Sequence, residues 1–339
     1  MTEAAYRVLQ LGRETTFGTS VAATTLFPCD PGSGEFELDR APESPDEDYG
    51  VAVRHQAGRG SFGVRAATGS LNANVRFEDI GHLLTMTLGT AVTSGTAAPY
   101  THTFTGDTTT STVKPYTIEV SDDTQDWDVV SVLCTQLDLS YDAITAPGNS
   151  MWTAAATLQG IDKAKSTATT GLTAPTTLET VEGHLTALYE GPVGTAFASL
   201  SELTGSLVSY SVSISDPKPL RAYGGTAITD DKATGHGRQK RETTFSAMLK
   251  LSATTVTNMF DIFNVSGGLP TDRRWRVKAI GSSSKSLIID GRVRFTSVNI
   301  APDERDGERL VSVDGYYVYD STIASDIQIA VSNGVATLP

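Results

Sequence analysis

Two parts of the chain show the same pattern of alternating apolar and polar residues followed by apolar residues at helical spacing. Alternation predicts a half-buried strand, and a spacing of three to four residues predicts an amphipathic helix. The first copy consists of Leu71, Ala73, Val75 and Phe77, then Ile80, Leu83 and Leu84. The second copy consists of Phe245, Ala247, Leu249 and Leu251, then Val256, Met259, Phe260 and Phe263. The sequence therefore predicts an internal duplication of a β unit with a short helix.

The surroundings of the two copies also agree. Each copy follows a loop in which acidic residues precede basic ones, and each is followed by a hairpin-like pair of strands and a further strand. The strands expected after the first helix are residues 116–120, 129–141 and 152–158, and those after the second are residues 275–279, 287–295 and 310–319. Between the copies lies a stretch rich in Ser, Thr, Ala, Gly and Pro, which is typical of a linker.

We therefore predict a mainly β protein of two similar β-sandwich or barrel-like units. Each unit has a short flanking helix, and the chain adds extended N- and C-terminal arms and long inter-strand loops. The expected divisions are an N-terminal arm at residues 1–27, a first β domain at 28–162, a linker at 163–182, a second β domain at 183–325 and a C-terminal tail at 326–339.

Composition supports this architecture and narrows the possible partners. The 339 residues are 39% hydrophobic and 19% charged, with a net charge of −13. Residues 1–180 hold 10 Lys and Arg against 22 Asp and Glu, so most of the excess negative charge lies in the first half. Such a chain is unsuited to gripping nucleic acid, because that binding rests on neutralising phosphates.

The two cysteines and the N-terminus bear on the cellular compartment. Cys29 and Cys134 are too few for a metal cluster and are expected to be small buried apolar residues. Residues 1–12 contain Glu3 and no basic region before an apolar run, so no signal peptide is expected. No stretch approaches the ~18 apolar residues of a membrane-spanning helix. We expect a soluble protein made in a reducing cytoplasm, with no membrane partner.

Several motifs that resemble catalytic or ligand-binding sequences lack their required context. Residues Gly58–Gly63 read G-x-G-x-x-G, but the kinase lysine and catalytic-loop motifs are missing and a strand, not a helix, follows. The acidic run Asp303–Glu308 lacks the ligand pattern of a calcium loop. The five histidines show no metal-ligand spacing. We expect no enzyme activity, no cofactor and no metal.

One segment resembles a known family. Residues Leu11–Thr19, Leu-Gly-Arg-Glu-Thr-Thr-Phe-Gly-Thr, look like the G-x-E-T-T-[YFW]-G-T motif of the major tail tube proteins of long-tailed (siphovirus-type) bacteriophages. Three further segments fit the layout of that family: Gly69-Ser-Leu71, Tyr100–Phe104 and the Tyr-Thr-Ile-Glu-Val strand at residues 116–120. The resemblance covers most of residues 6–160 and reaches the second half only through the repeat.

The resemblance implies a structural virion protein. Subunits of this family assemble into rings whose inner strands form one lumen, and the rings stack into a hollow tube that conducts double-stranded DNA into the host. Six units per ring is usual, so a chain with two units implies a trimer with pseudo-sixfold symmetry in preference to a hexamer. Tape-measure, tail-terminator and tail-tip proteins are the other implied partners. The implied location is the virion tail, and the host cytoplasm during assembly.

Two sets of charged residues are candidates for this function. An acidic lumen wall would repel passing DNA and avoid specific binding. The lumen-lining candidates are Asp122, Asp123, Asp126 and Asp128, with Glu190 in what is expected to be a similar turn. Opposite charges in the two long loops would register one ring on the next. The ring-stacking candidates are Asp46, Glu47, Asp48, Arg54, Arg59, Asp230, Asp231, Arg238, Lys240 and Arg241.

Other functions remain compatible with the sequence. The chain is also compatible with another virion part, namely a tail terminator, a head-tail joining protein or the tube of a contractile tail. A secreted β-domain adhesin is a further alternative, which a signal peptide would favour. The ordinary interpretation of the candidate residues is that they are solvated hairpin tips and loops.

Overall fold

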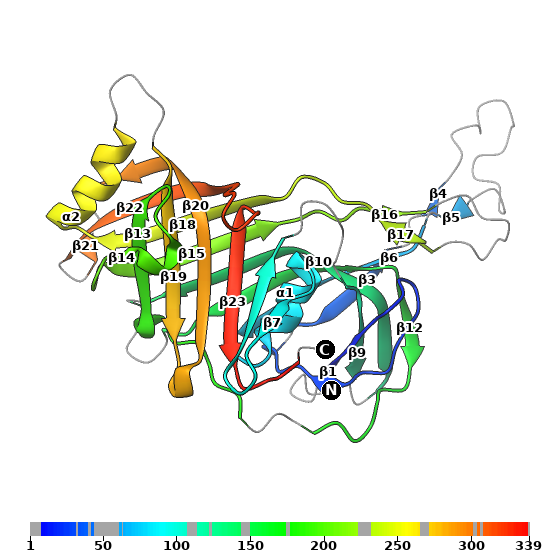
Figure 1. The fold of residues 1–339 in the computed structure, drawn as a ribbon. Coiled ribbons are helices and arrows are strands. Elements are labelled where there is room, and N and C mark those ends of the chain that lie inside the picture. Colours follow the sequence, from blue (N-terminus) through cyan, green and yellow to red (C-terminus); the bar gives the residue numbers. More distant parts are fainter. Residues whose placement is uncertain are drawn as a thin grey trace, which may run out of the picture.

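The computed structural model describes residues 8–31, 33–39, 42–43, 61–62, 64–106, 114–121, 124–143, 150–173, 177–222, 232–264, 271–300, 304–305 and 308–337. These residues form large antiparallel sheets with short helices, so the predicted mainly β, sandwich-like fold class is confirmed. Long strands cross the upper part of the molecule, and two groups of strands lie below them at either end (Figure 1).

The first half of the chain supplies twelve of the numbered strands and the longer α-helix. Its elements are β1 (Val8–Arg13), β2 (Thr25–Leu26), β3 (Glu35–Asp39), β4 (Pro42–Glu43), β5 (Ser61–Phe62), β6 (Ala66–Asn74), α1 (Ile80–Leu88), β7 (Val92–Ser94), β8 (Tyr100–Thr105), β9 (Tyr116–Ser121), β10 (Asp126–Asp142), β11 (Thr153–Gly160) and β12 (Asp162–Ser166).

The second half begins with a 3₁₀ turn and carries the remaining elements. These are η3 (Gly183–Leu185), β13 (Thr186–Pro192), η4 (Phe197–Ser199), β14 (Ser201–Glu202), β15 (Leu207–Ser215), β16 (Leu220–Arg221), β17 (Gly235–His236), β18 (Glu242–Lys250), α2 (Ala253–Thr255), the π-helical η5 (Val256–Asp261), β19 (Arg273–Ile280), η6 (Ser282–Ser284), β20 (Ser286–Asn299), β21 (Glu304–Arg305), β22 (Glu308–Val318) and β23 (Ile327–Asn333).

One long sheet runs through both halves of the chain. Its strands pair in the order β3, β6, β11, β10, β15, β18, β22 and β20, all antiparallel. The two halves meet where β10 pairs with β15, from Gln136 opposite Ser215 to Asp142 opposite Ser209. Hydrogen bonds from Asp216 N to Thr135 O and from Ala143 N to Val208 O, both 2.9 Å, continue this ladder at its two ends. The halves are thus joined by the backbone itself.

Two strands leave the long sheet and enter a second layer. The first part of β10 pairs with β9 and β12; β9 also pairs with β1, and β1 pairs with β2. In the same way, the first part of β20 pairs with β19 and β23; β19 also pairs with β13, and β13 pairs with β14. The strand β8 of the first half joins the outer side of β23 and carries β7, which is a second contact between the halves.

The bulges in the two long strands also correspond. The register of β10 against β11 shifts between Cys134 and Gln136, and that of β20 against β22 shifts between Phe295 and Ser297. A threonine occupies the bulge in each case. Thr135 Oγ1 donates to Thr157 O at 3.2 Å, and Thr296 Oγ1 donates to Asp314 O at 3.1 Å. Because bulges bend a strand and raise its twist, these two residues lie where each long strand leaves one layer for the other.

The interior lies between the long sheet and the layer below it. Successive side chains of a strand point to opposite faces, so alternate residues such as Leu137 and Leu139 of β10 are fully buried. Every residue of α1 is buried, and the helix packs against β10 and β8. One tryptophan in each half, Trp152 and Trp275, is fully buried and contacts aromatic neighbours. The two halves share one continuous apolar core.

The Glu-Thr-Thr segment noted in the sequence has a structural role. Glu14 is fully buried at the end of β1, and its carboxylate accepts hydrogen bonds from Thr117 Oγ1 (2.8 Å), Ser131 N (2.7 Å) and Ser131 Oγ (2.5 Å). Gly18 N donates to the same Ser131 hydroxyl at 2.6 Å. Burial raises the pKa of Glu14, against the effect of these hydrogen bonds. The motif thus ties the first strand and the turn after it to β9 and β10.

The ends of the chain are more regular than the sequence indicates. Within the segment expected to be an arm, β1 pairs with β9 along its whole length. Within the segment expected to be a tail, β23 lies between β20 and β8. Residues 162–166, at the start of the expected linker, form β12. The short runs of alternation in these segments carry too little periodicity to be recognised, but their backbone groups complete existing sheets.

Candidate functional surface

The outward face of the long sheet carries small polar side chains. In β15, Val208, Tyr210, Val212 and Ile214 are buried, whereas the serines between them face the other side and are half-buried. The same division holds in β6, β11 and β18, whose outward residues are mostly Thr, Ser, Ala and Asn. A sheet with one apolar and one hydroxyl-rich face has a polar surface to present to water or a partner. We call this outward surface the polar face.

The register aligns these side chains in rows that cross the joint between the halves. One row runs Asn74, Thr153, Ser140, Ser211, Ser246, Asp314, and the next runs Asn72, Ala155, Asp138, Ser213, Thr244, Tyr316. Neighbouring hydroxyls bond along a row, as between Ser140 Oγ and Thr153 Oγ1 at 3.1 Å. The rows consist of mostly small polar side chains on both sides of the β10–β15 joint, so the polar face is one surface.

The charged residues on the polar face are mainly acidic. They are Glu35, Glu37 and Asp39 on β3, Asp138 and Asp142 on β10, Glu242 on β18 and Asp314 on β22. Positive charge on the same face comes from Lys250 and, at the β20 end, from Arg292 and Arg294. Both arginines are ion-paired with Asp272, at 2.6 and 2.7 Å. The face is therefore polar, lined by short side chains and negative in balance.

Of the predicted lumen residues in the β9–β10 hairpin, the two that the structure describes, Asp126 and Asp128, lie away from this face. Asp126 accepts hydrogen bonds from Ser121 Oγ (2.6 Å) and Ala168 N (2.8 Å), which tie the hairpin to the chain after β12. Burial raises the pKa of Asp128, which is half-buried. Asp122 and Asp123 lie outside the described residues. The two described aspartates hold local structure in addition to any other role.

Glu190 lies within strand β13 and not in the turn that the sequence indicated. The side chain is buried, and its carboxylate accepts hydrogen bonds from Arg273 Nε (2.9 Å), Arg273 Nη2 (2.5 Å) and Asn258 Nδ2 (2.7 Å). A buried carboxylate with this set of donors is neutralised within the chain. The adjacent Gly191-Pro192 pair suggested a turn, but both residues still pair with β19.

Three of the predicted stacking residues are described, and they behave differently from one another. Lys240 is solvent-exposed, with Nζ 3.6 Å from Glu242. Arg238 Nε lies 3.5 Å from Asp216, and Arg241 is partly buried and ion-paired with Asp326. The other candidates, and the glycine-rich motif, fall outside the described residues apart from the backbone of residues 61–62: Asp46, Glu47, Asp48, Arg54, Arg59, Asp230, Asp231 and Gly58–Gly63.

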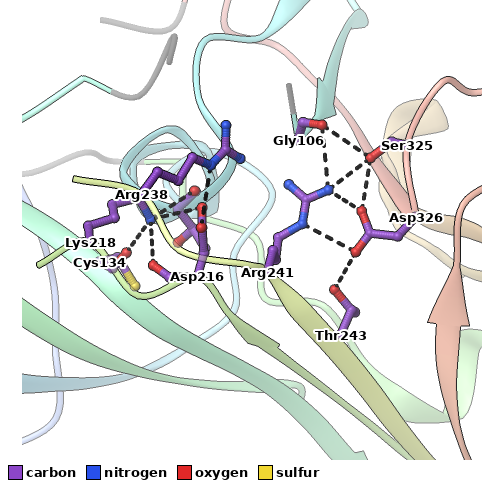
Figure 2. Close-up of polar contacts among 10 residues, drawn as sticks. Gly106, Cys134, Asp216, Lys218, Arg238, Arg241, Thr243, Ser325 and Asp326 are labelled. Atoms are coloured by element: carbon purple, nitrogen blue, oxygen red, sulfur yellow. Dashed lines mark hydrogen bonds and ion pairs between the residues drawn. The ribbon is translucent and has the colours of Figure 1, made fainter. Parts of the chain in front are cut away.

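Two ionic clusters, one buried and one partly buried, hold the base of the loop that includes β16 and β17 (Figure 2). In the first, Lys218 Nζ donates to Cys134 O (2.8 Å), Thr87 O (3.2 Å) and Asp216 O (3.2 Å) and pairs with the Asp216 carboxylate at 3.2 Å. Burial lowers the pKa of Lys218, and the charge of Asp216 opposes that shift. The first cluster therefore fastens the outgoing end of the loop to β10 and α1.

The second cluster fastens the returning end of the loop. Arg241 pairs with both carboxylate oxygens of Asp326 and also donates to Ser325 Oγ at 3.0 Å, while Thr243 Oγ1 donates to Asp326 at 2.8 Å. Burial would raise the pKa of Asp326, but the hydrogen bonds and charge of Arg241 outweigh it and hold the pKa below its ordinary value. This cluster connects the start of β18 to the segment before β23.

Sequence reasoning missed the polar face itself. The alternation of Ser with Val, Tyr and Ile in β15 was visible, but serine alone does not indicate a surface with a role. The acids of β3 were assigned to a charged loop, although Phe36 and Leu38 alternate with them. Only the register of the sheet reveals that these residues share one face.

Two other kinds of feature would bear on function, namely metal sites and membrane-spanning helices. Across the described ranges, no group of three or more His, Cys, Asp or Glu side chains is placed to hold a metal ion. None of the helices that the structure describes is both long and apolar enough to cross a membrane.

The fold and the polar face define a class of protein: a β-sheet building block with a wide, continuous polar surface. The comparison with protein families agrees. A family model described as phage tail tube protein matches residues 6–271. The chain therefore belongs to the phage tail tube protein family, whose members are structural components of the virion tail and assemble into a tube. No curated protein matches the chain.

The second ionic cluster leads to a prediction about stability. We expect Arg241→Met to lower the free energy of unfolding by about 2 kcal/mol at pH 7, because it leaves the largely buried carboxylate of Asp326 without its cation. The matched control is Lys240→Met, at the exposed neighbouring position, which should change stability little. Urea denaturation followed by tryptophan fluorescence measures both.

The same cluster predicts how the difference in the free energy of unfolding between wild type and Arg241→Met depends on pH. The pKa of Asp326 is lowered in the folded state, so its stabilisation is present above its unfolded pKa of about 3.9 and is lost as the pH falls through the lower folded value. The gap between wild type and Arg241→Met should therefore narrow below about pH 4. Equal stability of the two proteins at pH 7 would contradict the assigned role of the pair.

Proposed function

We propose that this chain is the major tail tube subunit of a siphovirus-type phage and that three copies form each ring of the tube. In this proposal the polar face lines the lumen, rings stack along one axis, and double-stranded DNA passes through to the host. The observation that carries the proposal is the continuous sheet, which gives a single hydroxyl-rich, acidic face across both halves of the chain. Family membership supports the role in the tube.

The two halves of the chain support the number of copies. We propose that they are products of an internal duplication. The support is the repeated pairing order around β10 and β20, and the threonine-containing bulge in each strand. If each half occupies one sixth of a ring, three chains make a pseudo-sixfold ring. Head-to-tail stacking of such rings does not close on itself and produces a filament.

The first prediction from the proposed function concerns the assembled particle. Purified protein at high concentration should form hollow rods visible by negative-stain electron microscopy. Native mass spectrometry of the smallest ring should give three times the chain mass of 35.8 kDa. A ring of six chains would rule out the pseudo-sixfold arrangement, and single rings that never stack would favour a tail terminator or head-tail joining protein.

The chemistry of the polar face suits passage of DNA. Duplex DNA carries one negative charge per ~1.7 Å, and each contact with Lys or Arg adds binding energy. Repeated in every ring, such contacts would hold the DNA in place. Short hydroxyl side chains and scattered carboxylates keep the surface hydrated but do not attract the DNA phosphates. The arginines at the β20 end are already paired with Asp272. DNA would therefore pass without specific binding.

The second prediction separates the two candidate lumen surfaces. Asp138→Lys with Asp314→Lys places positive charge on the polar face, and we expect DNA ejection from such virions to slow severalfold at low salt and recover at high salt. The control is Asp126→Lys with Asp128→Lys in the β9–β10 hairpin. Both variants must first form normal tubes. If only the control variant slows ejection, the β9–β10 hairpin and not the polar face lines the lumen.

We propose that the two long loops mediate stacking. Their bases, β4–β5 and β16–β17, extend to the same side of the molecule (Figure 1). Residues Arg65 and Lys232, one from each loop base, form a parallel bridge and both pair with Asp162, at 3.5 and 2.6 Å. The loops carry opposite charges in their sequences, from Asp46, Glu47 and Asp48 to Arg54 and Arg59, and from Asp230 and Asp231 to Lys240.

The third prediction follows from charge-based stacking. Each exposed ion pair is worth only ~0–1 kcal/mol and is screened by salt, but a ring repeats it around the axis. Tubes assembled in about 1 M NaCl, where the Debye length is about 3 Å, should be shorter than those formed at low salt. Rings should remain intact. Tube lengths that do not change with salt would refute electrostatic stacking.

Tape-measure, tail-terminator and tail-tip proteins are the further partners that we propose for assembly in the host cytoplasm.

A further inference from the structure

The joint between the two halves provides a template for a contact between chains. At this joint, Leu137 and Leu139 of β10 lie opposite Ile214 and Val212 of β15, and all four side chains are at most 1% exposed. The even-numbered residues of β15 make the backbone hydrogen bonds to β10, as the bonds from Asp216 N to Thr135 O and from Ala143 N to Val208 O indicate. The joint therefore combines a backbone ladder with a dry apolar row.

Each strand of the joint has a counterpart in the opposite half of the chain. The counterpart of β15 is β3 in the first half, and the counterpart of the end of β10 is the end of β20 in the second half. β3 pairs with β6 as β15 pairs with β18, which aligns Leu38 with Ile214 and Phe36 with Val212. The threonine bulges align Val298 of β20 with Leu137, and Ile300 with Leu139. Among the described strands, β3 pairs only with β6, and residues 295–299 of β20 pair only with β22. Each strand therefore ends the long sheet at one side.

Apolar side chains are exposed at these two edges. Leu38 is 44% exposed and Ile300 is 38% exposed, whereas the residues that correspond to them at the internal joint, Ile214 and Leu139, are fully buried. An unpaired edge with exposed apolar residues is a ready site for pairing with another strand. The two edges are complementary because each matches one side of the internal joint.

We propose that β3 of one chain pairs antiparallel with the end of β20 of the next chain, in the register of the internal β10–β15 joint. The inference rests on the proposed ring and identifies the contact that closes it. Transfer of the register places Leu38 opposite Val298, Phe36 opposite Ile300 and Glu37 opposite Asn299. The apolar pairs would then bury Leu38 and Ile300, and the polar face would continue from one chain into the next.

The charges and backbone groups at the edges fit this pairing. Glu37 meets Asn299 and Asp39 meets Ser297, so no like charges lie directly opposite one another. The carbonyl of Phe36, on the outer side of β3, accepts a hydrogen bond from Lys163 Nζ at 2.8 Å. A carbonyl oxygen has two lone pairs and can accept a second bond from the incoming strand.

Disulfide trapping tests the register. Glu37 and Asn299 are exposed, and they correspond to Ser213 and Asp138 respectively, a pair without backbone hydrogen bonds between its members. The Cα atoms of such pairs are about 4.5 Å apart, which is within disulfide range. We expect Glu37→Cys with Asn299→Cys, oxidised in assembled tubes, to shift most of the protein to covalent dimers and closed trimers on non-reducing gels, with no band above the trimer.

Three control experiments allow the cross-linked bands to be interpreted. Asp138→Cys with Ser213→Cys is the same pair within one chain and should form an internal disulfide without any change in chain number. Each single variant, which retains Cys29 and Cys134, should stay monomeric. Asp39→Cys with Asn299→Cys displaces the register by two residues and should cross-link much less.

The outcomes distinguish this inference from the proposed function. Normal tubes in which the double variant stays monomeric, while the internal control is oxidised, would overturn the edge pairing and leave the tube role intact. Stronger cross-linking by the displaced pair would overturn the register. Failure of the unmodified protein to form tubes under any condition would instead count against the proposed function.

Discussion

The fold depends on the backbone hydrogen bonds between β10 and β15. Through this ladder, together with the pairing of β8 with β23, two halves that would otherwise be separate sandwiches share one sheet and one apolar core. An unpaired strand edge leaves a row of donors and acceptors unsatisfied and is prone to uncontrolled association. Pairing the edge of one half with the edge of the other removes this problem at the centre of the molecule and leaves it only at the two ends of the sheet.

The two ionic clusters complement that joint. Lys218 and Asp216 lie directly after β15, and Arg241 and Asp326 connect the start of β18 with the segment before β23. A buried ion pair adds little net stability, but loss of one partner is costly. The clusters therefore fix the direction in which the chain leaves β15 and returns to β18.

Much of the fold was predictable because it rests on local patterns. Alternation identified the strands β6, β10, β11 and β18, and apolar spacing identified α1. The charged residues were less predictable, because a carboxylate in a sequence carries no sign of its partner. Glu190 and Arg241 were expected to be exposed, yet Arg273 and Asp326 pair with them from distant strands. The polar face could not be predicted at all, because it arises from the register of strands that are far apart in the chain.

The covalent connection across the β10–β15 joint has a thermodynamic consequence. Because both strands belong to one polypeptide, this joint is intramolecular and its occupancy does not change on dilution. A joint of the same geometry between chains would instead obey mass action. An assembly built from such chains would contain seams of two kinds in alternation, one permanent and one reversible. Protein concentration would then control only half of the seams, which lowers the entropic cost of closing a ring.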